Sequence, residues 1–500
     1  MRYEELGDAG VRTGAGVPEM RVTSGMFMSL DDFERHIKSG GRCHLVGIGG
    51  VSMSPLAEIL HGMGVDLTGS DISDSFAVGS LRSLGIRVSV GHCAENVRGA
   101  GYVIRTAAAR DDNVEIIAAR EQGIPVFERA QAWGYIMRGY KEAVCVSGVH
   151  GKTTTTSMIT HILLAAETDP TIMIRGTLPI LGSGYRVGRG DVIAVESCEY
   201  YNSFHCFFPT VAVVLNVDAD HLDFFHDVDD LKSSFRKFAS LVPEDGHIVC
   251  NGDDENTLDA LMPLERELLT FGMGGKASVR GVNVRSNGRN PSMDVHYNGG
   301  HYCKIELQVP GVHNLKNALA AAAAAIAVGI SASAIEKGLN NYTGVSRRFE
   351  YKGSINGADV YDDYAHHPSE LRATLDAVSS LGYERVILAF QPHTFSRTHA
   401  LFSDFVTELS RPDMTFLAEI YAAREKNDIG ISSGTLAEAI PGARYLATFR
   451  ELVEEISSVA RGGDIVLTVG AGDIYKVGEA LVRRVAESLV AEAGGLGGGI

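Results

Sequence analysis

Residues 148–154, GVHGKTT, have the residue types and spacing of a loop that binds a nucleoside triphosphate. A glycine-rich turn at the start of a helix exposes backbone N–H groups, and the positive end of the helix dipole favours phosphate. Lys152 can add a charge at the β- and γ-phosphates, and Thr153 can offer its hydroxyl to Mg²⁺. The loop is shorter than the pattern G-x-x-x-x-G-K-[ST], because its first glycine lies three residues before the second. The alternative is an ordinary strand-to-helix turn with a solvated lysine; we favour phosphate binding because the flanking strand and helix are both expected.

Two acidic clusters follow apolar strand-like runs and are candidates for the oxygen ligands that Mg²⁺ needs. The first cluster is ESCE, in which Glu196 is our first choice of ligand. The second cluster is NVDADHLD, which contains His221, the least expected ligand for a hard ion. Open α/β sheets place their ligands at the carboxyl ends of the strands, where both clusters are expected. Each cluster alone is equally well a solvated loop, so the metal hypothesis depends on the phosphate loop nearby.

A second glycine turn, GIGG, follows a strand-like run near the start of the chain. It lacks the complete G-x-G-x-x-G of dinucleotide-binding folds. Gly47, Gly49 and Gly50 fit a loop that lets backbone amides approach a pyrophosphate, which NAD, FAD and UDP-sugars all contain. Asp71, about 20 residues further on, is placed to accept a hydrogen bond from a ribose hydroxyl. A tight turn that only allows helix packing is the alternative.

Two polar clusters, DDYAHHP and QPHTFSR, each follow a strand-like run in the last third of the chain. A single histidine in such a place is more often a surface residue or a satisfied core residue. The occurrence of His366, His393 and Arg397 at corresponding strand ends nevertheless indicates a site for the group as a whole. Arg347 and Arg348, near the expected hinge, are placed to reach the phosphates across a closing cleft.

The composition is that of a globular protein and excludes several classes of function. A net charge of −17 opposes nucleic-acid phosphates, so we predict no nucleic-acid partner. The seven cysteines are scattered singly, which favours a reducing cytoplasm, and no C-x-x-C pair supports a zinc site. The longest apolar run, Ala318 to Ile330, has 13 residues. It is shorter than the ~18–20 residues that cross a bilayer, so it predicts a buried helix and no membrane insertion.

The elements that must position these residues alternate between strand-like and helical runs, which predicts an α/β fold with mostly parallel sheets and flanking helices. We expect three compact domains joined by short hinges, with the Ala-rich helix closing the central one. The first 30 residues lack the basic start and apolar stretch of a signal peptide. The expected ranges are an N-terminal extension at 1–40, a Rossmann-like domain at 41–140, a central phosphate-loop domain at 141–345, a Rossmann-like C-terminal domain at 346–492 and a flexible tail at 493–500.

The chain resembles the Mur ligase family in an ordered set of segments: GIGG, GVHGKTTTT, ESCEYYNSF, NVDADHLDFF, GVHNLKNALAA, DDYAHHPSE, FQPHTFSRT and GAGDI. The resemblance covers about residues 41–480, and DDYAHHP together with FQPHTFSRT is its specific part. The phosphate loop is shared with folylpolyglutamate synthetase. The resemblance implies a domain for the UDP moiety, a central ATPase and a C-terminal domain that closes over ATP. It also implies the reaction that joins L-alanine to the muramate carboxylate of UDP-N-acetylmuramate through an acyl phosphate, giving ADP and phosphate in peptidoglycan precursor synthesis.

The resemblance further implies the role of single residues, with ATP and Mg²⁺ as cofactors. The implied ATP-binding residues are Gly148, His150, Gly151, Lys152, Thr153, Thr154, Asn314, Asn317, Arg348 and Asp363, the two asparagines belonging with His313 to an HN-x-x-N motif that contacts adenine. The implied UDP-substrate residues are Gly47, Gly49, Gly50, Ser52, Asp71, Thr106 and His393. The implied metal ligands are Thr153, Glu196 and His221, and the implied catalytic residues are Lys152, His366 and Arg397. The expected partners are UDP-N-acetylmuramate and L-alanine, and the expected form is a cytoplasmic monomer or homodimer.

Two departures from the family pattern bear on the expected site residues. Many relatives read E-A-D-E-S where this chain reads E-S-C-E-Y, so Cys198 replaces an acid and receives no role. Thr394 stands where some relatives have arginine, so no carboxylate contact is carried over to it. Three alternatives stay open: a recycling ligase that attaches a whole peptide to the same UDP-muramate, an oxidoreductase that binds a dinucleotide at GIGG, and a noncatalytic UDP-sugar binding protein. The residues that argue against the last are Lys152, Thr153, Glu196 and His221.

Overall fold

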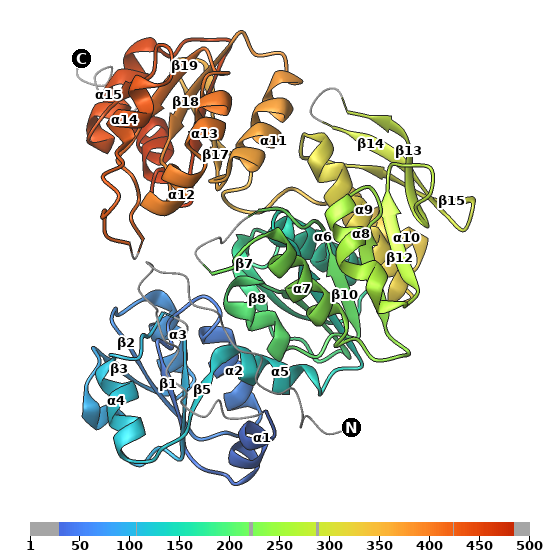
Figure 1. Cartoon of the computed structure of the whole chain (residues 1–500), viewed down its shortest axis with the longest axis vertical. Helices are drawn as coiled ribbons and strands as arrows, with labels where there is room; N and C mark the ends of the chain where they lie inside the picture. Colours follow the sequence, from blue (N-terminus) through green and yellow to red (C-terminus); the bar gives the residue numbers. More distant parts are fainter. Residues whose placement is uncertain (1–29, 107, 220–223, 287–289, 424, 485–500) are drawn as a thin grey trace, which may run out of the picture.

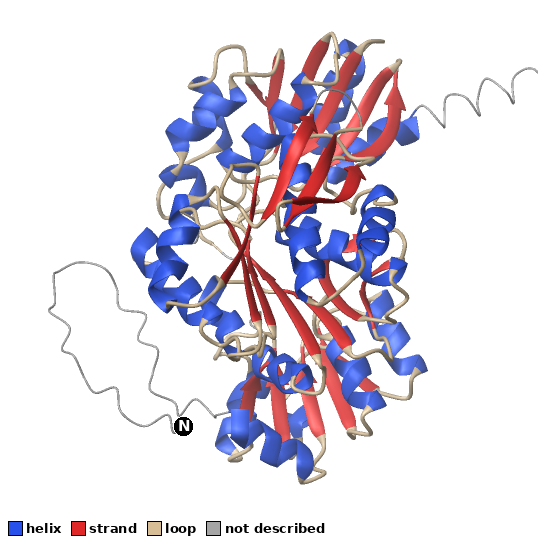
Figure 2. Cartoon of the chain, turned by 90° about the vertical axis from the view of Figure 1, so that its right-hand side faces the viewer, coloured by secondary structure: helices blue, strands red, loops and turns tan. Residues whose placement is uncertain are grey.

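The structure is a computed structural model that describes residues 30–106, 108–219, 224–286, 290–423 and 425–484. These residues form three α/β domains, each built on one sheet with flanking helices, which confirms the predicted fold class (Figure 1 and Figure 2). The first 29 residues of the expected extension, the tail at 493–500 and His221 lie outside the described residues.

The N-terminal domain has a five-stranded parallel sheet in the order β3-β2-β1-β4-β5. Because the order reverses between β1 and β4, the carboxyl ends of these two strands flank the crevice where such sheets bind ligands. Its elements are α1 (Leu30–Lys38), β1 (Cys43–Val46), α2 (Ser54–Gly62), β2 (Leu67–Asp71), α3 (Phe76–Ser83), β3 (Arg87–Val90), the 3-10 helix η1 (Ala94–Val97), β4 (Tyr102–Arg105), α4 (Val114–Glu121), β5 (Val126–Glu128) and α5 (Arg129–Met137). Helix α1 was not predicted, and it packs against α5 with Phe33 fully buried.

The central domain has a ten-stranded sheet in the order β15-β14-β13-β12-β11-β10-β6-β9-β7-β8. The sheet is parallel from β13 to β7 and antiparallel at both edges. Its elements are β6 (Glu142–Ser147), α6 (Lys152–Ala165), β7 (Thr171–Leu178), β8 (Ser183–Arg186), β9 (Val192–Glu196), η2 (Tyr200–Cys206), β10 (Val211–Val214), α7 (Val228–Ala239), β11 (His247–Asn251), α8 (Glu255–Leu261), η3 (Met262–Leu264), β12 (Leu268–Gly272), β13 (Val279–Arg285), β14 (Ser292–Tyr297), β15 (Gly300–Glu306), α9 (Val312–Ala327) and α10 (Ala332–Asn340).

The Ala-rich run forms the buried helix α9, as predicted, with Ala318, Leu319 and alanines 320 to 325 almost fully buried. Small side chains let α9 approach α6 and the sheet closely. Helix α9 does not close the domain, however, because α10 follows it and packs on α6. Gly338 makes this approach possible, since a Cβ there would lie 2.5 Å from Ile162 Cα.

The C-terminal domain has a six-stranded sheet in the order β16-β17-β21-β18-β19-β20, in which only the β16 edge is antiparallel. Its elements are β16 (Glu350–Ile355), β17 (Ala358–Asp363), α11 (Pro368–Ser379), β18 (Arg385–Phe390), α12 (Phe395–Ala400), α13 (Phe402–Leu409), β19 (Met414–Leu417), α14 (Ser433–Glu438), β20 (Arg444–Tyr445), α15 (Phe449–Val459) and β21 (Asp464–Val469). The described chain ends in helical residues 475–484.

Helix α5 lies where the N-terminal and central domains meet (Figure 1). A continuous apolar core runs through both domains there. Trp133 is 1% exposed and belongs to the same buried cluster as Phe204 and Phe235 of the central domain. A Cβ at Gly134 would overlap the carbonyl oxygen of Cys206, so the backbone of α5 lies directly on η2. The first hinge is therefore packed, whereas the buried clusters of the C-terminal domain contain only its own residues.

Candidate functional site

The phosphate loop connects β6 to α6, and its glycines are required by its conformation. Gly148 and Gly151 have φ angles of +136° and +83°, which only glycine adopts without strain. A Cβ at Gly151 would lie 2.5 Å from Asn317 Oδ1, and one at Gly148 would lie 2.9 Å from Leu215 Cβ. The loop therefore presents its backbone at the N-terminus of α6 in the arrangement that binds an anion.

Lys152 lies folded over this loop and is paired with a carboxylate that the sequence did not single out. Its Nζ donates to the carbonyl oxygens of Gly148 and Val149 and to both oxygens of Glu199, at 3.1 and 3.0 Å. Burial lowers the pKa of Lys152, but the charges of Glu199, Cys198 and Glu196 and the hydrogen bond with Glu199 together outweigh this, and the pKa is raised. Lys152 is thus held as a cation beside the loop, where a phosphate needs it.

Thr153 and Glu196 bring two hard oxygen ligands together at the end of β9. Thr153 Oγ1 donates to Glu196 Oε2 at 3.0 Å, and the backbone N–H of Arg175 donates to the same oxygen at 2.9 Å. Glu196 is 6% exposed, and the guanidinium of Arg175 lies 4.0 Å from its other oxygen. A hydroxyl and a carboxylate in contact suit Mg²⁺. The predicted third ligand, His221, lies outside the described residues, and those residues contain no cluster of three His, Cys, Asp or Glu that could hold a metal.

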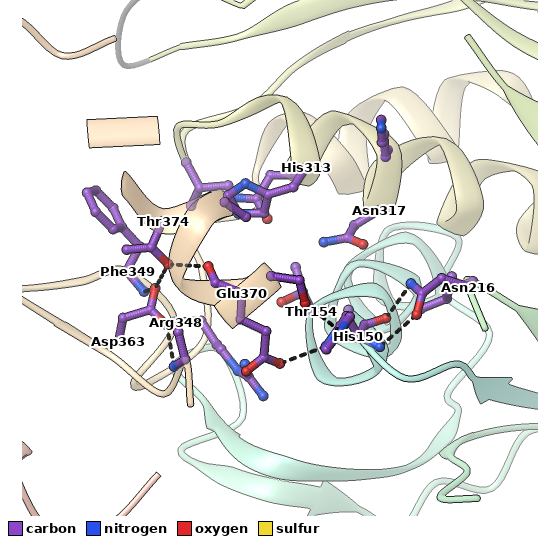
Figure 3. A pocket seen from close by; sticks show the side chains of 18 of the residues that line it. His150, Thr154, Asn216, His313, Asn317, Arg348, Phe349, Asp363, Glu370 and Thr374 are labelled. Carbon is purple, nitrogen blue, oxygen red and sulfur yellow. Dashed lines mark hydrogen bonds and ion pairs between the residues drawn. The ribbon is translucent and has the colours of Figure 1, made fainter. Parts of the chain in front are cut away.

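A cavity lies between the phosphate loop, the start of α9 and α11 (Figure 3). The residues predicted to bind ATP that line it are His150, Gly151, Thr154, Asn314, Asn317, Arg348 and Asp363. Gly148, Lys152 and Thr153 do not line it. His313 also lines this cavity, and burial lowers its pKa to about 4, so it is neutral there. The central and C-terminal domains therefore build one pocket together.

Asp363 is held at the wall of this cavity by bonds within the C-terminal domain. Its Oδ1 accepts from the backbone N–H of Ala365 at 2.8 Å, and its Oδ2 accepts from the N–H of Phe349 and from Thr374 Oγ1, each at 3.2 Å. Burial raises its pKa to about 6, against the opposing charge of Arg348. Asp363 is thus a fixed acceptor at the end of β17.

His150 is the residue of the phosphate loop that touches the C-terminal domain. Asn216 pins its backbone, accepting from the His150 N–H at 2.8 Å and donating to its carbonyl oxygen at 3.0 Å. Its ring contacts α11, with Nδ1 at 3.2 Å from Glu370 Oε1 and Nε2 at 2.8 Å from Ser369 Oγ. Asp218 Oδ2 lies 3.7 Å from Nε2. The loop and the C-terminal domain are therefore in direct contact through one side chain.

The structure brings His366, His393 and Arg397 together, as their strand-end positions led us to expect. The two rings have centroids 5.6 Å apart, and Arg397 Nη1 lies 3.1 Å from His393 Nδ1. Tyr421, which the sequence did not indicate, stacks on His393 at 5.6 Å. Thr394 has a φ of +66°, a conformation that costs energy for a β-branched residue and is often found at functional sites.

Arg347 does not reach the cavity, which corrects the expectation that it acts with Arg348 on the phosphates. Its Nε donates to Asp362 Oδ2 at 3.0 Å, and its Nη atoms donate to the carbonyl oxygens of Gly470 and Gly472 at 2.6 and 2.9 Å. These partners are all in the C-terminal domain and satisfy the guanidinium there. Arg348 alone of the pair lines the cavity.

The predicted UDP-binding turn follows β1 at the crevice of the N-terminal sheet. Gly47 has a φ of +77°, and a Cβ on it would lie 2.6 Å from Thr106 Cγ2, so Gly47 and Thr106 are neighbours at the ends of β1 and β4. Asp71 accepts from the backbone N–H of Gly49 at 2.9 Å and from that of Ser73 at 3.2 Å. It therefore closes the turn, and its contact with a ribose stays a prediction.

Ser52 follows this turn, and its carbonyl oxygen accepts from Trp133 Nε1 at 3.2 Å. Its hydroxyl has no hydrogen-bond partner among the described residues. The carbonyl contact ties the turn to helix α5.

No described helix is long and apolar enough to cross a bilayer.

Three family models match the chain in succession. The model described as "Mur ligase family, catalytic domain" matches residues 42–141, "Mur ligase middle domain" matches residues 146–325, and "Mur ligase, glutamate ligase domain" matches residues 347–472. The matched ranges follow the three sheets.

Curated relatives match over nearly their whole length. A protein of Caldanaerobacter subterraneus named UDP-N-acetylmuramate–L-alanine ligase is 44% identical over 448 residues, which is 89% of this chain and 97% of that protein. A protein of Acetivibrio thermocellus with the same name is 45% identical over 447 residues, 88% of this chain and 95% of that protein. The crystal structure of UDP-N-acetylmuramate-alanine ligase from Thermotoga maritima superposes with a TM-score of 0.75 at 29% identity, covering 90% of this chain and all of that one.

Proposed function

Because this chain belongs to the Mur ligase family, we propose that it is an ATP-dependent ligase that joins L-alanine to the muramate carboxylate of UDP-N-acetylmuramate. The relatives at 44% and 45% identity and the structure at 29% identity all carry the name of this activity. The products are ADP, phosphate and the UDP-linked muramoyl-alanine. This step belongs to peptidoglycan precursor synthesis.

The observation that carries the proposal is the meeting of Lys152 and the Thr153–Glu196 oxygen pair beside a cavity shared by two domains. A carboxylate and ATP are both anions, so their approach needs positive charge. Lys152 supplies one such charge at the loop, and Mg²⁺ held at Thr153 and Glu196 would supply more to the transferring phosphoryl group. These residues support the proposal of phosphoryl transfer to a carboxylate.

The second half of the reaction needs shelter from water. The muramate carboxylate attacks the γ-phosphorus and ADP leaves; the amine of L-alanine then attacks the acyl carbon, loses a proton, and phosphate leaves with the C–O bond electrons. An acyl phosphate hydrolyses if water enters, and a C-terminal domain docked on the phosphate loop limits that access. His366, His393 and Arg397 lie on that domain and are our candidates for contact with the substrates.

The remaining assignments form part of this proposal. The adenosine of ATP would lie in the cavity at Asn314 and Asn317, with its phosphates on the loop near Arg348. The UDP moiety would lie at the glycine turn after β1, near Thr106. The cytoplasm as the place of action and a monomer or homodimer as the form stay predictions.

The test is an ATPase-coupled ligation assay on the purified full-length chain. ADP and phosphate should be released only when UDP-N-acetylmuramate and a small amino acid are both present, and Lys152→Ala should abolish the release. L-alanine, glycine, L-serine and a tripeptide are compared as acceptors. Preference for the tripeptide would replace the proposal with a recycling ligase, and preference for glycine or serine would change the acceptor. A bound redox cofactor with no need for Lys152 would support an oxidoreductase.

A further inference from the structure

The nucleotide pocket contains a contact between two domains, in which the side chain of His150, from the phosphate loop, meets helix α11. The imidazole bridges two residues of that helix. Its Nε2 contacts Ser369, and its Nδ1 contacts Glu370, as Figure 3 shows. The two residues are 219 and 220 positions away from His150 in the sequence, so the contact depends entirely on how the domains meet. We call the three residues His150, Ser369 and Glu370 the docking triad.

The loop side of the docking triad is rigid. Asn216 both accepts from the backbone N–H of His150 and donates to its carbonyl oxygen. The following residue, Gly151, has the left-handed conformation that starts α6. The direction of the His150 side chain is therefore set by the same backbone that grips a phosphate. Whether the ring can contact α11 therefore depends on the position of the phosphate loop.

The helix side of the triad is the first turn of α11, where Glu370 uses its two oxygens for two purposes. Oε2 accepts from the backbone N–H groups of His366 and His367 at 3.0 and 3.3 Å, which caps the helix. Oε1 faces His150. Because α11 also supplies Ala373 and Thr374 to the cavity, docking of its first turn places one wall of the nucleotide pocket.

The opposite charges of His150 and Glu370 stabilise the docked arrangement only when both residues are present. Burial lowers the pKa of His150, but the hydrogen bonds with Asp218 and Glu370 outweigh this and raise it to about 9. The pKa of Glu370 is lowered well below its usual value, because the charges of His366, His150 and Arg348 outweigh burial. His150 and Glu370 are 20% and 15% exposed. An ion pair buried to this degree is stable when complete, and removal of one partner leaves a poorly solvated charge.

The triad also touches the candidate catalytic cluster. His366 Nδ1 lies 3.3 Å from Glu370 Oε2, and the His366 ring lies beside His393, which contacts Arg397. A shift of α11 relative to the loop would therefore move the histidines with it. Docking and the arrangement of the acceptor side are mechanically linked through Glu370.

We propose that His150 is a positioning residue that docks the C-terminal domain on the phosphate loop through Ser369 and Glu370, and thereby couples nucleotide binding to assembly of the pocket. This inference rests on the nucleotide site of the proposed function and not on the identity of the acceptor. The probe is therefore AMP-PNP with Mg²⁺, which requires no turnover. A protein that binds AMP-PNP but ligates a different acceptor would disprove the proposed reaction and leave the docking triad standing.

The variants are chosen to keep the fold. Glu370→Gln retains one carbonyl oxygen, which must then serve either the helix cap or His150. His150→Asn keeps a polar side chain that is too short to reach α11. Ser369→Ala removes the neutral contact with His150 together with the contact of the same hydroxyl with His367 Nδ1. Asp376→Asn is the matched control, because Asp376 lies on the same helix, is 61% exposed and pairs with Arg411 inside the C-terminal domain. Thermal unfolding identifies any variant that does not fold, in which case the other two carry the test.

The measurements are AMP-PNP affinity and small-angle X-ray scattering of the full-length chain with and without AMP-PNP. Glu370→Gln and His150→Asn should each weaken AMP-PNP binding by about tenfold or more, as expected for loss of a hydrogen bond between charged groups. Both should have a larger radius of gyration with AMP-PNP than the wild type, while Asp376→Asn matches the wild type. The double variant should be no weaker than the poorer single one. Additive losses, or unchanged affinity and compactness in both single variants, would overturn the proposal.

Discussion

Where the N-terminal domain meets the central domain, helix α5 buries Trp133 in a cluster that runs through both domains. Where the central domain meets the C-terminal domain, His150 meets Ser369 and Glu370 through hydrogen bonds and charge. Apolar burial is non-directional, and its free energy is proportional to the apolar area kept from water, so opening such an interface costs stability with every part that is exposed. A polar contact exchanges readily with water when it opens, because each group regains hydrogen bonds. We therefore expect the first junction to stay closed and the second to open and close around a nucleotide.

The largest effect is expected at the apolar junction, from Trp133→Ala. Removing a buried tryptophan costs about 3–5 kcal/mol through lost transfer free energy and the cavity left behind. Because Trp133 belongs to a core shared by two domains, calorimetry should show the N-terminal and central domains unfolding in one transition that this change lowers.

Phe405→Ala is the matched control for this change. Phe405 is fully buried in the C-terminal domain, so its loss should lower a different transition. Separate transitions for the first two domains in the wild type would contradict the shared core.

The polar junction should respond to pH where the apolar one does not. The pKa of His150 is raised to about 9 by Asp218 and Glu370, so its ion pair is fully formed below about 6.5, the usual pKa of histidine, and is lost as the pH rises through about 9. The other groups around the ring are Lys152, which opposes its charge, the ring of His367, and Ser369. AMP-PNP affinity of the wild type should fall about tenfold between pH 7 and pH 9.5, the fold expected for a hydrogen bond between charged groups.

His150→Asn provides the baseline for this titration, because it removes the titrating ring and leaves the other groups of the pocket in place. Its affinity profile should be nearly flat over the same range. A fall of equal size in His150→Asn would assign the pH dependence to another group and weaken the contrast between the junctions.

The parts of the fold and site that were predictable are those encoded in short stretches of sequence. The phosphate loop can be predicted from residues 148–154 alone. The position of His366 and His393 at the carboxyl ends of their strands was enough to predict that they lie close together. The shared core around α5 was not predictable, because it depends on which distant apolar residues face Trp133.

Pairings between side chains that are distant in the sequence could not be predicted either. Glu199 was visible as an acid, but its pairing with Lys152 needs the folded loop. Arg347 was wrongly placed at the phosphates, because its partners near residues 470–472 are more than 120 positions away. Helix α1 was missed because nine residues give too short a periodic pattern to separate from an irregular extension.

The smallest effect tests whether polar groups at the edge of the apolar junction matter to it. The guanidinium carbon of Arg138 lies 4.2 Å from the ring centroid of Phe208, and its Nη1 donates to Glu34 at 3.0 Å. Arg138→Ala should cost about 0.5–1 kcal/mol of unfolding free energy, as for a partly exposed cation–π contact, and leave AMP-PNP affinity unchanged. Arg450→Ala, which removes an exposed ion pair with Glu454, is the control and should change stability by less. A loss above about 2 kcal/mol, or a change in nucleotide affinity, would mean that the first junction also depends on charge and that the contrast between the two junctions is smaller than their cores suggest.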